Sequence, residues 1–460
     1  EAATCEDFIK AIEEANGIDL AQFRRWYHQA GTPTVTASGT YDPEGQRYSL
    51  TLTQHHGSQK TSDPLMIPVR MGLITQAGET MTLKPEGEAD TAVEEGVLCL
   101  TETTHTFTFT DINSPPIPSL FRGFSAPIKL KLDLADDALA VLASHDPDHF
   151  NRWEAKQTLA TRVMLAAIER DDATIPDTLT GLFAATLEAD DLPNRFRSLM
   201  LQLPSEQYLA QQLEVIDPDL IHRIRKAFVE GLAARFTDQW QQLYERLAKD
   251  AAPTPNAQQI GRRSLRNTVL GYLCAAPDQP GVALAAAQYD QADNMTDRIA
   301  ALGQLVDAPE EAHANHAAKA LQDFYTRWEN EALVIDKWFM IQARSSHPDT
   351  RSRVQALTKH PAFTLTNPNR LRSLIGVFAA GNQRHFHSAD GQGYQLLIDT
   401  VIALNSLNPQ TAARLLSPMR QWRRFEPTRR DAMAAQLRRL LAQPDLSRDV
   451  FEVATKSLEK

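Results

Sequence analysis

One pair of histidines in the sequence, His145 and His149, has the spacing of zinc ligands on a helix. A zinc peptidase of the His-Glu-x-x-His type places two imidazoles on one helix face and uses the glutamate as general base. Here Asp146 stands in place of that glutamate, and Pro147 lies between the histidines. Because proline interrupts a helix, we expect this pair on a turn or at a helix start. We therefore predict no metal site in this chain.

Other residue types that catalyse reactions are present without a recognisable arrangement. The sequence contains no GxSxG elbow, no Walker A loop and no GxGxxG turn. Its three cysteines, Cys5, Cys99 and Cys274, are far apart and form no CxxC pair. This usage disfavours a disulfide framework and fits a reducing cytoplasm, where we expect buried free thiols. We predict no catalytic residue in this chain.

The balance of charge argues against nucleic acid as a partner. The formal net charge is -11, whereas neutralising phosphates requires a concentrated basic surface. A basic cluster around Trp422 and Phe425 allows three interpretations: a solvated helix end, which we favour, an RNA-binding patch, or positive potential facing into a cavity. No apolar run approaches the roughly 20 residues that span a bilayer, so no membrane association is expected. The cluster contains Arg420, Arg423, Arg424, Arg429 and Arg430.

The predicted secondary structure changes type along the chain. Residues 1–35 have the pattern of two short helices. Thr4 and Asp7 have the spacing of a capping box, and Gly17 is placed to end the first helix. Asp19 is expected to cap the second. Two helices cannot bury this many aromatic side chains, so we expect them to pack on something that precedes residue 1. A start at Glu rather than Met fits a piece of a longer protein. The apolar positions of the second helix are Leu20, Phe23, Trp26 and Tyr27.

Residues 36–135 change to the alternating pattern of β-strands. Apolar and polar residues alternate over 48–53, 104–110 and 128–132, and clusters of turn residues separate these segments. About seven short strands without helical patterns between them are typical of a small antiparallel β-sandwich. We predict that fold here.

Residues 136–460 have helical periodicity almost throughout, with prolines at intervals of roughly 15 to 20 residues. Helices of this length joined by short turns build an α-helical superhelix, because each pair buries its apolar face on the next. Such a superhelix presents a concave surface. The polar segment 385–394, which carries two histidines and two glycines, is either a substrate-contacting loop or a plain connection between helices. The predicted fold is therefore a mixed multidomain one, a β-sandwich followed by a large all-α superhelical domain.

Six stretches spread over most of the chain resemble the bacterial aminopeptidase N family, which is a family of zinc-dependent, gluzincin-type aminopeptidases. They occur in the family's order and agree with the zones drawn from periodicity. The stretches are FRRWYHQAGTP at 23–33, LFRGFSAP at 120–127, HDPDHFNRWEA at 145–155, WFMIQA at 338–343, TNPNRLRSLIG at 366–376 and LNPQTAARL at 407–415.

The resemblance implies that this chain is the C-terminal half of such an enzyme, with residues 1–35 forming the end of its thermolysin-like catalytic domain. In the family, the preceding domains hold the HExxH zinc helix, its downstream glutamate ligand, the exopeptidase motif and an oxyanion-stabilising tyrosine. None of these motifs occurs in this sequence. The resemblance therefore implies zinc and catalysis in a full-length bacterial enzyme, a monomer, while this chain alone is predicted to be inactive.

The resemblance also implies a role for the helical domain, which closes over the catalytic domain and faces peptide substrates with polar residues. The positions that match this pattern are Arg372, Gln410 and Arg414. An arginine can pair with a peptide carboxylate, and a glutamine can hydrogen-bond its amides. Each also has a structural interpretation, because Arg414 can cap a helix and Gln410 follows Pro409 in a first turn. The alternative function is a self-standing helical scaffold or peptide-binding protein without activity.

Overall fold

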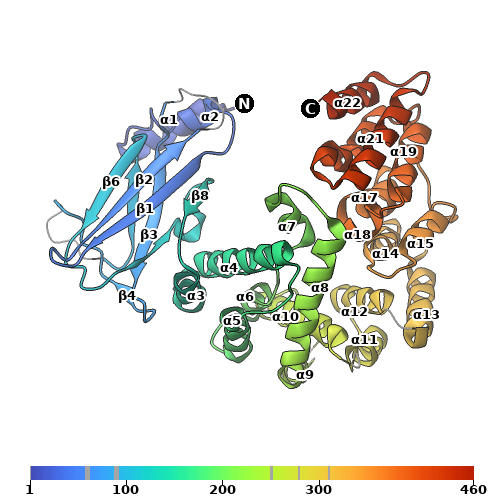
Figure 1. Cartoon of the computed structure of the whole chain (residues 1–460), viewed down its shortest axis with the longest axis horizontal. Coiled ribbons are helices and arrows are strands. Elements are labelled where there is room, and N and C mark those ends of the chain that lie inside the picture. Colours follow the sequence, from blue (N-terminus) through green and yellow to red (C-terminus); the bar gives the residue numbers. More distant parts are fainter. Residues whose placement is uncertain are drawn as a thin grey trace. The chain divides into compact units, whose positions relative to one another are not determined.

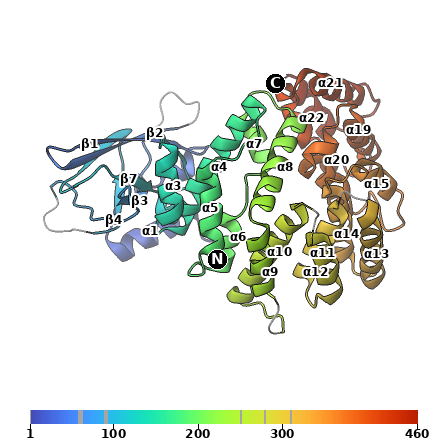
Figure 2. The same cartoon turned by 60° about the horizontal axis from the view of Figure 1, so that its bottom comes forward.

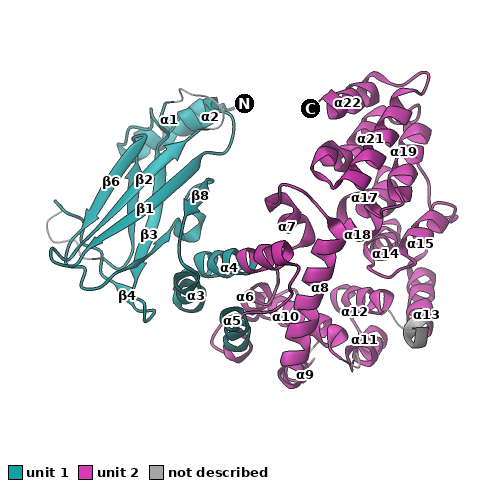
Figure 3. Ribbon diagram, viewed as in Figure 1, with its two compact units in different colours: residues 1–160, 177–185 teal, residues 161–176, 186–460 magenta. Residues whose placement is uncertain are grey.

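The structure is a computed structural model that describes residues 2–56, 63–87, 93–248, 252–277, 280–308 and 311–459, without the side chains of 311–314. It forms two compact units (Figure 3). Unit 1 comprises residues 1–160 and 177–185, and unit 2 comprises 161–176 and 186–460. The division into 1–35, 36–135 and 136–460 stays a prediction.

Unit 1 contains two β-sheets, as the alternating pattern predicts (Figure 1). One has the strand order β6-β2-β1-β8, and in the other β3 pairs with β4, β5 and β7. The pairing is mostly antiparallel, as predicted, and one pair differs, because β1 and β8 are parallel. The chain crosses from the second sheet to the first between β7 and β8, so no hairpin forces an antiparallel return. The strands are β1 Thr34–Asp42, β2 Arg47–His55, β3 Ile67–Ile74, β4 Thr80–Met81, β5 Gly96–Leu100, β6 Thr104–Phe109, β7 Ile117–Leu120 and β8 Lys129–Leu132.

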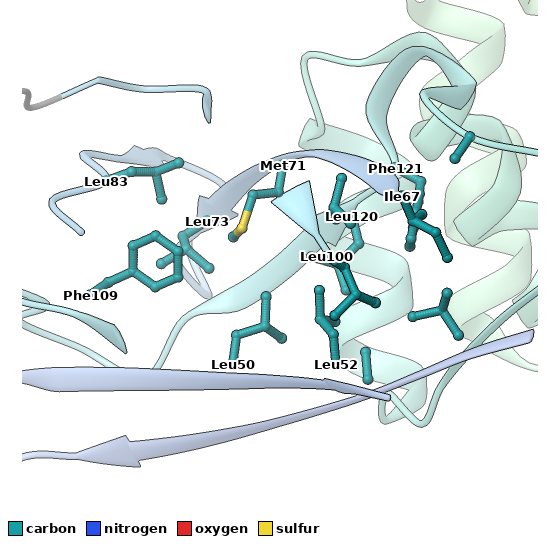
Figure 4. Packing of buried hydrophobic residues seen from close by; sticks show 14 of the residues in the cluster. Leu50, Leu52, Ile67, Met71, Leu73, Leu83, Leu100, Phe109, Leu120 and Phe121 are labelled. Atoms are coloured by element: carbon teal, nitrogen blue, oxygen red, sulfur yellow. The ribbon is translucent and has the colours of Figure 1, made fainter. Parts of the chain in front are cut away.

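The core of unit 1 follows from the period of two in its strands. Leu50 and Leu52 of β2 are fully buried, while the Thr51 hydroxyl between them lies on the outer face, 2.8 Å from that of Thr106. Figure 4 shows Leu50 and Leu52 opposite Met71 and Leu100 of the second sheet. Side chains from both sheets therefore meet in one apolar layer, to which Ile67, Leu73, Leu83, Phe109, Leu120 and Phe121 also belong.

The first helix has the boundaries that its capping residues predict, whereas the second is much shorter than expected. In α1 (Cys5–Asn16), the Thr4 and Asp7 side chains form the capping box, and Gly17 ends the helix at φ 63°. Only four residues form α2 (Arg25–His28). Side chains of α2 and of the turn before it contact the β-sandwich. The Trp26 indole N–H, for example, donates to the Met66 carbonyl at 2.9 Å.

Helices account for the remainder of the chain, and in unit 2 successive helices lie side by side (Figure 2). The helix α4 runs through the boundary between the units. The helices after the sandwich are α3 Asp136–His145, α4 His149–Arg170, α5 Asp177–Glu188, α6 Asn194–Met200, α7 Glu206–Gln212, α8 Pro218–Arg235, α9 Thr237–Arg246, α10 Ala257–Ala275, α11 Pro280–Gln291, α12 Met295–Asp307, α13 Glu311–Trp328, α14 Ala332–Arg344, α15 Thr350–Leu357, α16 Pro368–Leu371, the π-helix η2 Arg372–Gly376, α17 Val377–Gly381, α18 Gln383–Phe386, α19 Gln392–Leu404, α20 Pro409–Leu415, the 3₁₀-helix η3 Ser417–Arg424, α21 Pro427–Leu441 and α22 Arg448–Glu459.

Two segments of unit 2 that are more than 200 residues apart in sequence, 210–219 and 424–429, meet in what we call the closing contact. The Ile216 N–H donates to the Arg424 carbonyl at 2.7 Å, and the Glu426 N–H donates to the Ile216 carbonyl at 3.1 Å. The Arg424 guanidinium also donates to the last carbonyls of α7, at 3.1 Å from Ala210 and Gln211. The last carbonyls of a helix lack the usual donor four residues ahead, and the Ala210 carbonyl otherwise accepts only from the Leu213 N–H at 3.4 Å, so the arginine adds a donor at this helix end.

A second arginine holds the closing contact through buried polar bonds. Arg429 is 4% exposed, ion-pairs with Asp219, and lies 3.0 Å from the Glu426 carboxylate. Its guanidinium also donates to the carbonyl of His387. The His387 ring is buried, stacks on Phe425 and hydrogen-bonds the Tyr394 hydroxyl at 3.0 Å. The segment 385–394 therefore places the side chains of Phe386, His387 and Tyr394 in the core of unit 2.

No helix in the described parts of the chain is long and apolar enough to cross a membrane. The three cysteines are free, but the expectation that all are buried is wrong for Cys5 and Cys99, which are exposed. The alternation of β5 explains Cys99, because the next residue, Leu100, faces the core.

Candidate functional site

The histidine pair does not form a ligand set. His145 is the last residue of α3 and His149 the first of α4, so the predicted turn between them is confirmed. Asp146 between them is fully buried, with a carboxylate oxygen 3.4 Å from the Arg122 guanidinium. Burial raises the pKa of this carboxyl group. Asp146 therefore serves the packing of unit 1, and no cluster of three or more His, Cys, Asp or Glu side chains suited to a metal occurs among the described residues.

Two of the three residues implied by the resemblance line one pocket. A cavity of about 440 Å³ in unit 2 is lined by residues of α14, α16, η2, α17, α20 and η3, and by Gln207 of α7. Arg372 and Arg414 are among its lining residues, and both are exposed. Gln410 is exposed as well but does not line it. The structure therefore brings the two arginines to one place and leaves the glutamine outside.

The same local motif starts both helical segments that carry these arginines. Asn367 and Asn408 are N-caps, each followed by a proline at the first helical position. The Asn408 side chain accepts from the Thr411 N–H at 3.0 Å, and the Asn367 side chain accepts from the Asn369 N–H at 3.0 Å. An Asn-Pro start fixes where each helix begins, because the amide satisfies an orphan N–H and proline needs none.

A local change of helix type accompanies Arg372. The π-helix η2 begins at Arg372 and ends at Gly376, inside a run of otherwise α-helical residues. Single π-turns of this kind are frequent at functional sites. A Cβ at position 376 would lie 3.3 Å from the Arg372 Cγ, so the glycine leaves room for the arginine stem. A Cβ at Gly381 would likewise lie 4.0 Å from the Nε of Arg344.

The pocket has an unbalanced positive charge. Arg344, Arg372 and Arg414 line it, and no acidic residue does. Among the described residues, none of the three has an ion-pair partner; Arg372 has only a long hydrogen bond, 3.4 Å, to the Asn369 side chain. Arg344, which follows directly on the 338–343 stretch, is not among the residues predicted from the sequence. Its position in the last turn of α14 is a weak signal, because basic residues are common there for dipole reasons alone.

A larger cavity in unit 2, about 910 Å³, has mixed polar lining and no activated nucleophile. In it the Glu206 carboxylate lies 2.7 Å from the His222 Nδ1, and the other ring nitrogen is 3.4 Å from the Arg384 guanidinium. Burial raises the pKa of the Cys274 thiol to about 12 and also raises the pKa of Asp307. A thiol that stays protonated near neutral pH is a poor nucleophile, so this cavity has no evident chemistry of its own.

Two family models match successive parts of this chain. Residues 136–459 match the family described as a domain of unknown function, DUF3458_C, with ARM repeats, and residues 31–133 match DUF3458, described as having an Ig-like fold. The chain belongs to the DUF3458_C family, whose match covers most of its length.

Several proteins similar to this chain are aminopeptidases. The chain is 35% identical to aminopeptidase N of Escherichia coli (strain K12) over 99% of its own length and 38% identical to aminopeptidase N of Caulobacter vibrioides over 100%. A crystal structure of Legionella pneumophila aminopeptidase A in complex with aspartic acid matches all of this chain with a TM-score of 0.84 and 27% identity. The chain spans about half of each, 52%. These matches fit the C-terminal half of aminopeptidase N, as the resemblance implies.

Proposed function

We propose that this chain is the C-terminal part of a zinc-dependent aminopeptidase, in which it forms the lid and cavity wall and positions the peptide. The matches to aminopeptidases over its whole length support the class of reaction. Removal of N-terminal residues from peptides, and a bacterial origin, come from those relatives and from the family resemblance.

The observation that carries the positioning role is the pocket lined by Arg372 and Arg414. Both side chains are exposed and lack carboxylate partners among the described residues, so their N–H groups are available to a ligand. Guanidinium groups bind carboxylates through paired, charge-assisted hydrogen bonds. The free carboxylate at the far end of a short peptide is the group in such a substrate that complements them. Gln410 lies on the same helix as Arg414 and remains a candidate contact for longer peptides.

Zinc does not fit the residues of the described part of this chain, because they include no suitable cluster of ligands. The ligands and the general base would lie in the upstream domains, with residues 1–35 as the end of the catalytic domain. The role left to this chain is to bind and orient the peptide and to exclude larger molecules.

We also propose a cytoplasmic monomer as the full-length form. The three free cysteines support a reducing compartment, since two of them are exposed and unpaired. The monomer rests on the family resemblance alone. The partners are then peptide substrates and the protein's own upstream domains, with neither nucleic acid nor membrane involved.

The decisive experiment compares this chain with a longer protein that includes the upstream half. We expect the purified 460-residue chain to contain no stoichiometric zinc and to release no amino acid from an aminoacyl amide. The longer protein should contain zinc and should release the amino acid. Activity of the short chain would contradict the proposal, and inactivity of both would favour the alternative of a helical peptide-binding scaffold.

A further inference from the structure

The candidate pocket holds one cation more than a peptide carboxylate requires. A carboxylate has two oxygens, and one or two arginines can satisfy them with paired hydrogen bonds. Arg372 and Arg414 already provide that number. Arg344 adds a third guanidinium, and no lining residue supplies a compensating negative charge. A single carboxylate would leave this site with a net positive charge.

The fold explains why Arg344 lies at the pocket, but it provides no ion-pair partner for this side chain among the described residues. It is the last residue of α14, where the helix dipole favours a cation. Its Nε lies 4.0 Å from the position of a Cβ at Gly381, so no side chain of that residue separates it from the backbone of α17. The side chain is exposed, and no described residue forms an ion pair with it. An unpaired arginine at this position is available to a ligand.

The remaining lining residues fit a polar ligand with two negative charges. Gln207, Thr411 and Ser417 bring neutral hydrogen-bonding side chains, and the other residues are apolar or glycine. A cavity of about 440 Å³ is within the size range of small-molecule sites. Three arginines and neutral donors match two carboxylates that are held a few bonds apart.

We propose that Arg344 is a specificity-determining residue and that the pocket takes the carboxy-terminal end of a peptide whose last residue is acidic. Its α-carboxylate and its side-chain carboxylate together balance the three arginines. This inference rests on the proposed function, because it assumes that a peptide reaches the pocket. The substrate class is then short peptides with a terminal aspartate or glutamate, in preference to their amides and to neutral peptides.

The test uses the longer protein and three tripeptides, Ala-Ala-Asp, Ala-Ala-Asn and the amide of Ala-Ala-Asn. We expect kcat/KM to fall in that order, mainly through KM. Arg344→Ala should lower the ratio of kcat/KM for Ala-Ala-Asp to that for Ala-Ala-Asn by about tenfold, as expected for loss of a charged hydrogen bond. Both substrates meet the same enzyme sample, so partial misfolding leaves the ratio unchanged. Arg344→Lys, which keeps the charge, should restore part of it.

The matched control is Arg438→Ala, which removes an exposed arginine of α21 that lines neither the candidate pocket nor the larger cavity. It changes the net charge equally and should leave the ratio at its wild-type value. An unchanged ratio in Arg344→Ala, or an equal fall in Arg438→Ala, overturns the inference. A free dicarboxylate, succinate, should compete with Ala-Ala-Asp; if it binds more tightly than the peptide, the pocket is a site for small anions and the peptide assignment is wrong.

Failure of this inference can be told apart from failure of the proposed function. Hydrolysis of an aminoacyl amide by the longer protein supports the function whatever the tripeptide ratio is. If that hydrolysis is absent, calorimetry of this chain with Ala-Ala-Asp still tests the pocket. If Arg344→Ala then binds this peptide tenfold more weakly than the wild type, the result supports a site for two negative charges in a protein that is not an aminopeptidase. Equal binding by variant and wild type would reject both that site and the aminopeptidase function.

Discussion

Two groups of arginines in unit 2 show how differently the same side chain is used. Arg424 and Arg429, in the closing contact, donate to helix-end carbonyls or pair with carboxylates. Arg344, Arg372 and Arg414, in the candidate pocket, have no ion-pair partner among the described residues. The first group is clustered in sequence and has protein partners, whereas the second is spread over 70 residues and is exposed, without ion pairs to the described residues. A cluster of arginines in the sequence is therefore a poor guide to a ligand site. Whether an arginine is available to a ligand depends on its partners in the folded protein.

The partners of these side chains also show what the basic cluster at 420–430 does. Arg423 donates to the Ser457 carbonyl at 3.1 Å, and Arg424 and Arg429 serve the closing contact. The favoured interpretation of a solvated helix end is correct for Arg420, which is exposed, and for Arg430, whose side chain is 43% exposed. It is wrong for Arg429, which is buried. Its partner Asp219 lies 210 residues away in sequence, so periodicity alone gives no sign of it.

The largest expected effect is on stability, from Arg429→Ala. This change removes the buried guanidinium that donates to the His387 carbonyl and pairs with the Glu426 carboxylate, which then keeps only the backbone N–H groups of residues 428 and 429. Breaking such a buried pair costs about 3 kcal/mol in the free energy of unfolding. The urea midpoint measures it. Arg430→Ala, whose ion pair with Asp431 is exposed and 3.7 Å long, is the control and should cost less than about 0.5 kcal/mol. Equal losses would erase the contrast between buried and solvated arginines.

The closing contact should also depend on pH through His387. Burial, and then the positive charge of Arg429, lower the pKa of His387 to about 3 in the folded protein. The unfolded chain therefore binds a proton below its ordinary pKa of about 6.5 that the native state does not bind, and stability falls as the pH drops. Between pH 7 and 5 this loss should reach about 2 kcal/mol. His387→Gln should remove that part of the slope in denaturation at several pH values.

The control for His387 is Tyr394→Phe, which removes the hydroxyl bonded to the ring and keeps the imidazole. It should lower stability at every pH and retain the slope. If His387→Gln and the wild type lose stability equally between pH 7 and 5, the buried imidazole is not the source.

In the pocket, Arg372→Ala should affect binding and leave stability nearly unchanged. Removal of a charged hydrogen-bond donor should raise KM of the longer enzyme for tripeptides about tenfold, and raise it less for single-residue amides. The cost in unfolding free energy should stay below about 0.5 kcal/mol because the side chain is exposed. Steady-state kinetics with both substrates measures the difference. If KM rises equally for the two substrates, Arg372 does not position the peptide.

The smallest effect is expected from Gly376→Ala. The added methyl group would meet the Arg372 Cγ at 3.3 Å, so the arginine stem must shift by a few tenths of an ångström. A strained rotamer costs about 0.5 kcal/mol, which is roughly a twofold rise in KM for tripeptides. The double variant with Arg372→Ala is the check, since Gly376→Ala should then have no further effect on KM. A full additive effect would show that the glycine acts by another route.

The type and the order of most secondary-structure elements can be predicted from local patterns in the amino-acid sequence. The alternation over 48–53 and 104–110 places Leu50 and Phe109 in the core of unit 1. The prolines at 368 and 409, whose spacing marks breaks between helices, stand at the first positions of α16 and α20. These features are local, because a period of two or 3.6 and a cap depend on residues a few positions apart.

Which polar residues have partners depends on how distant segments of the chain pack together. The resemblance named Arg372, Gln410 and Arg414, but only the fold shows that Arg372 and Arg414 share a pocket, that Gln410 lies outside its lining, and that Arg344 joins it. The closing contact and the length of α2 were likewise beyond local patterns. Ion pairing depends on distances of a few ångströms between residues far apart in the chain, and a linear sequence does not carry those distances.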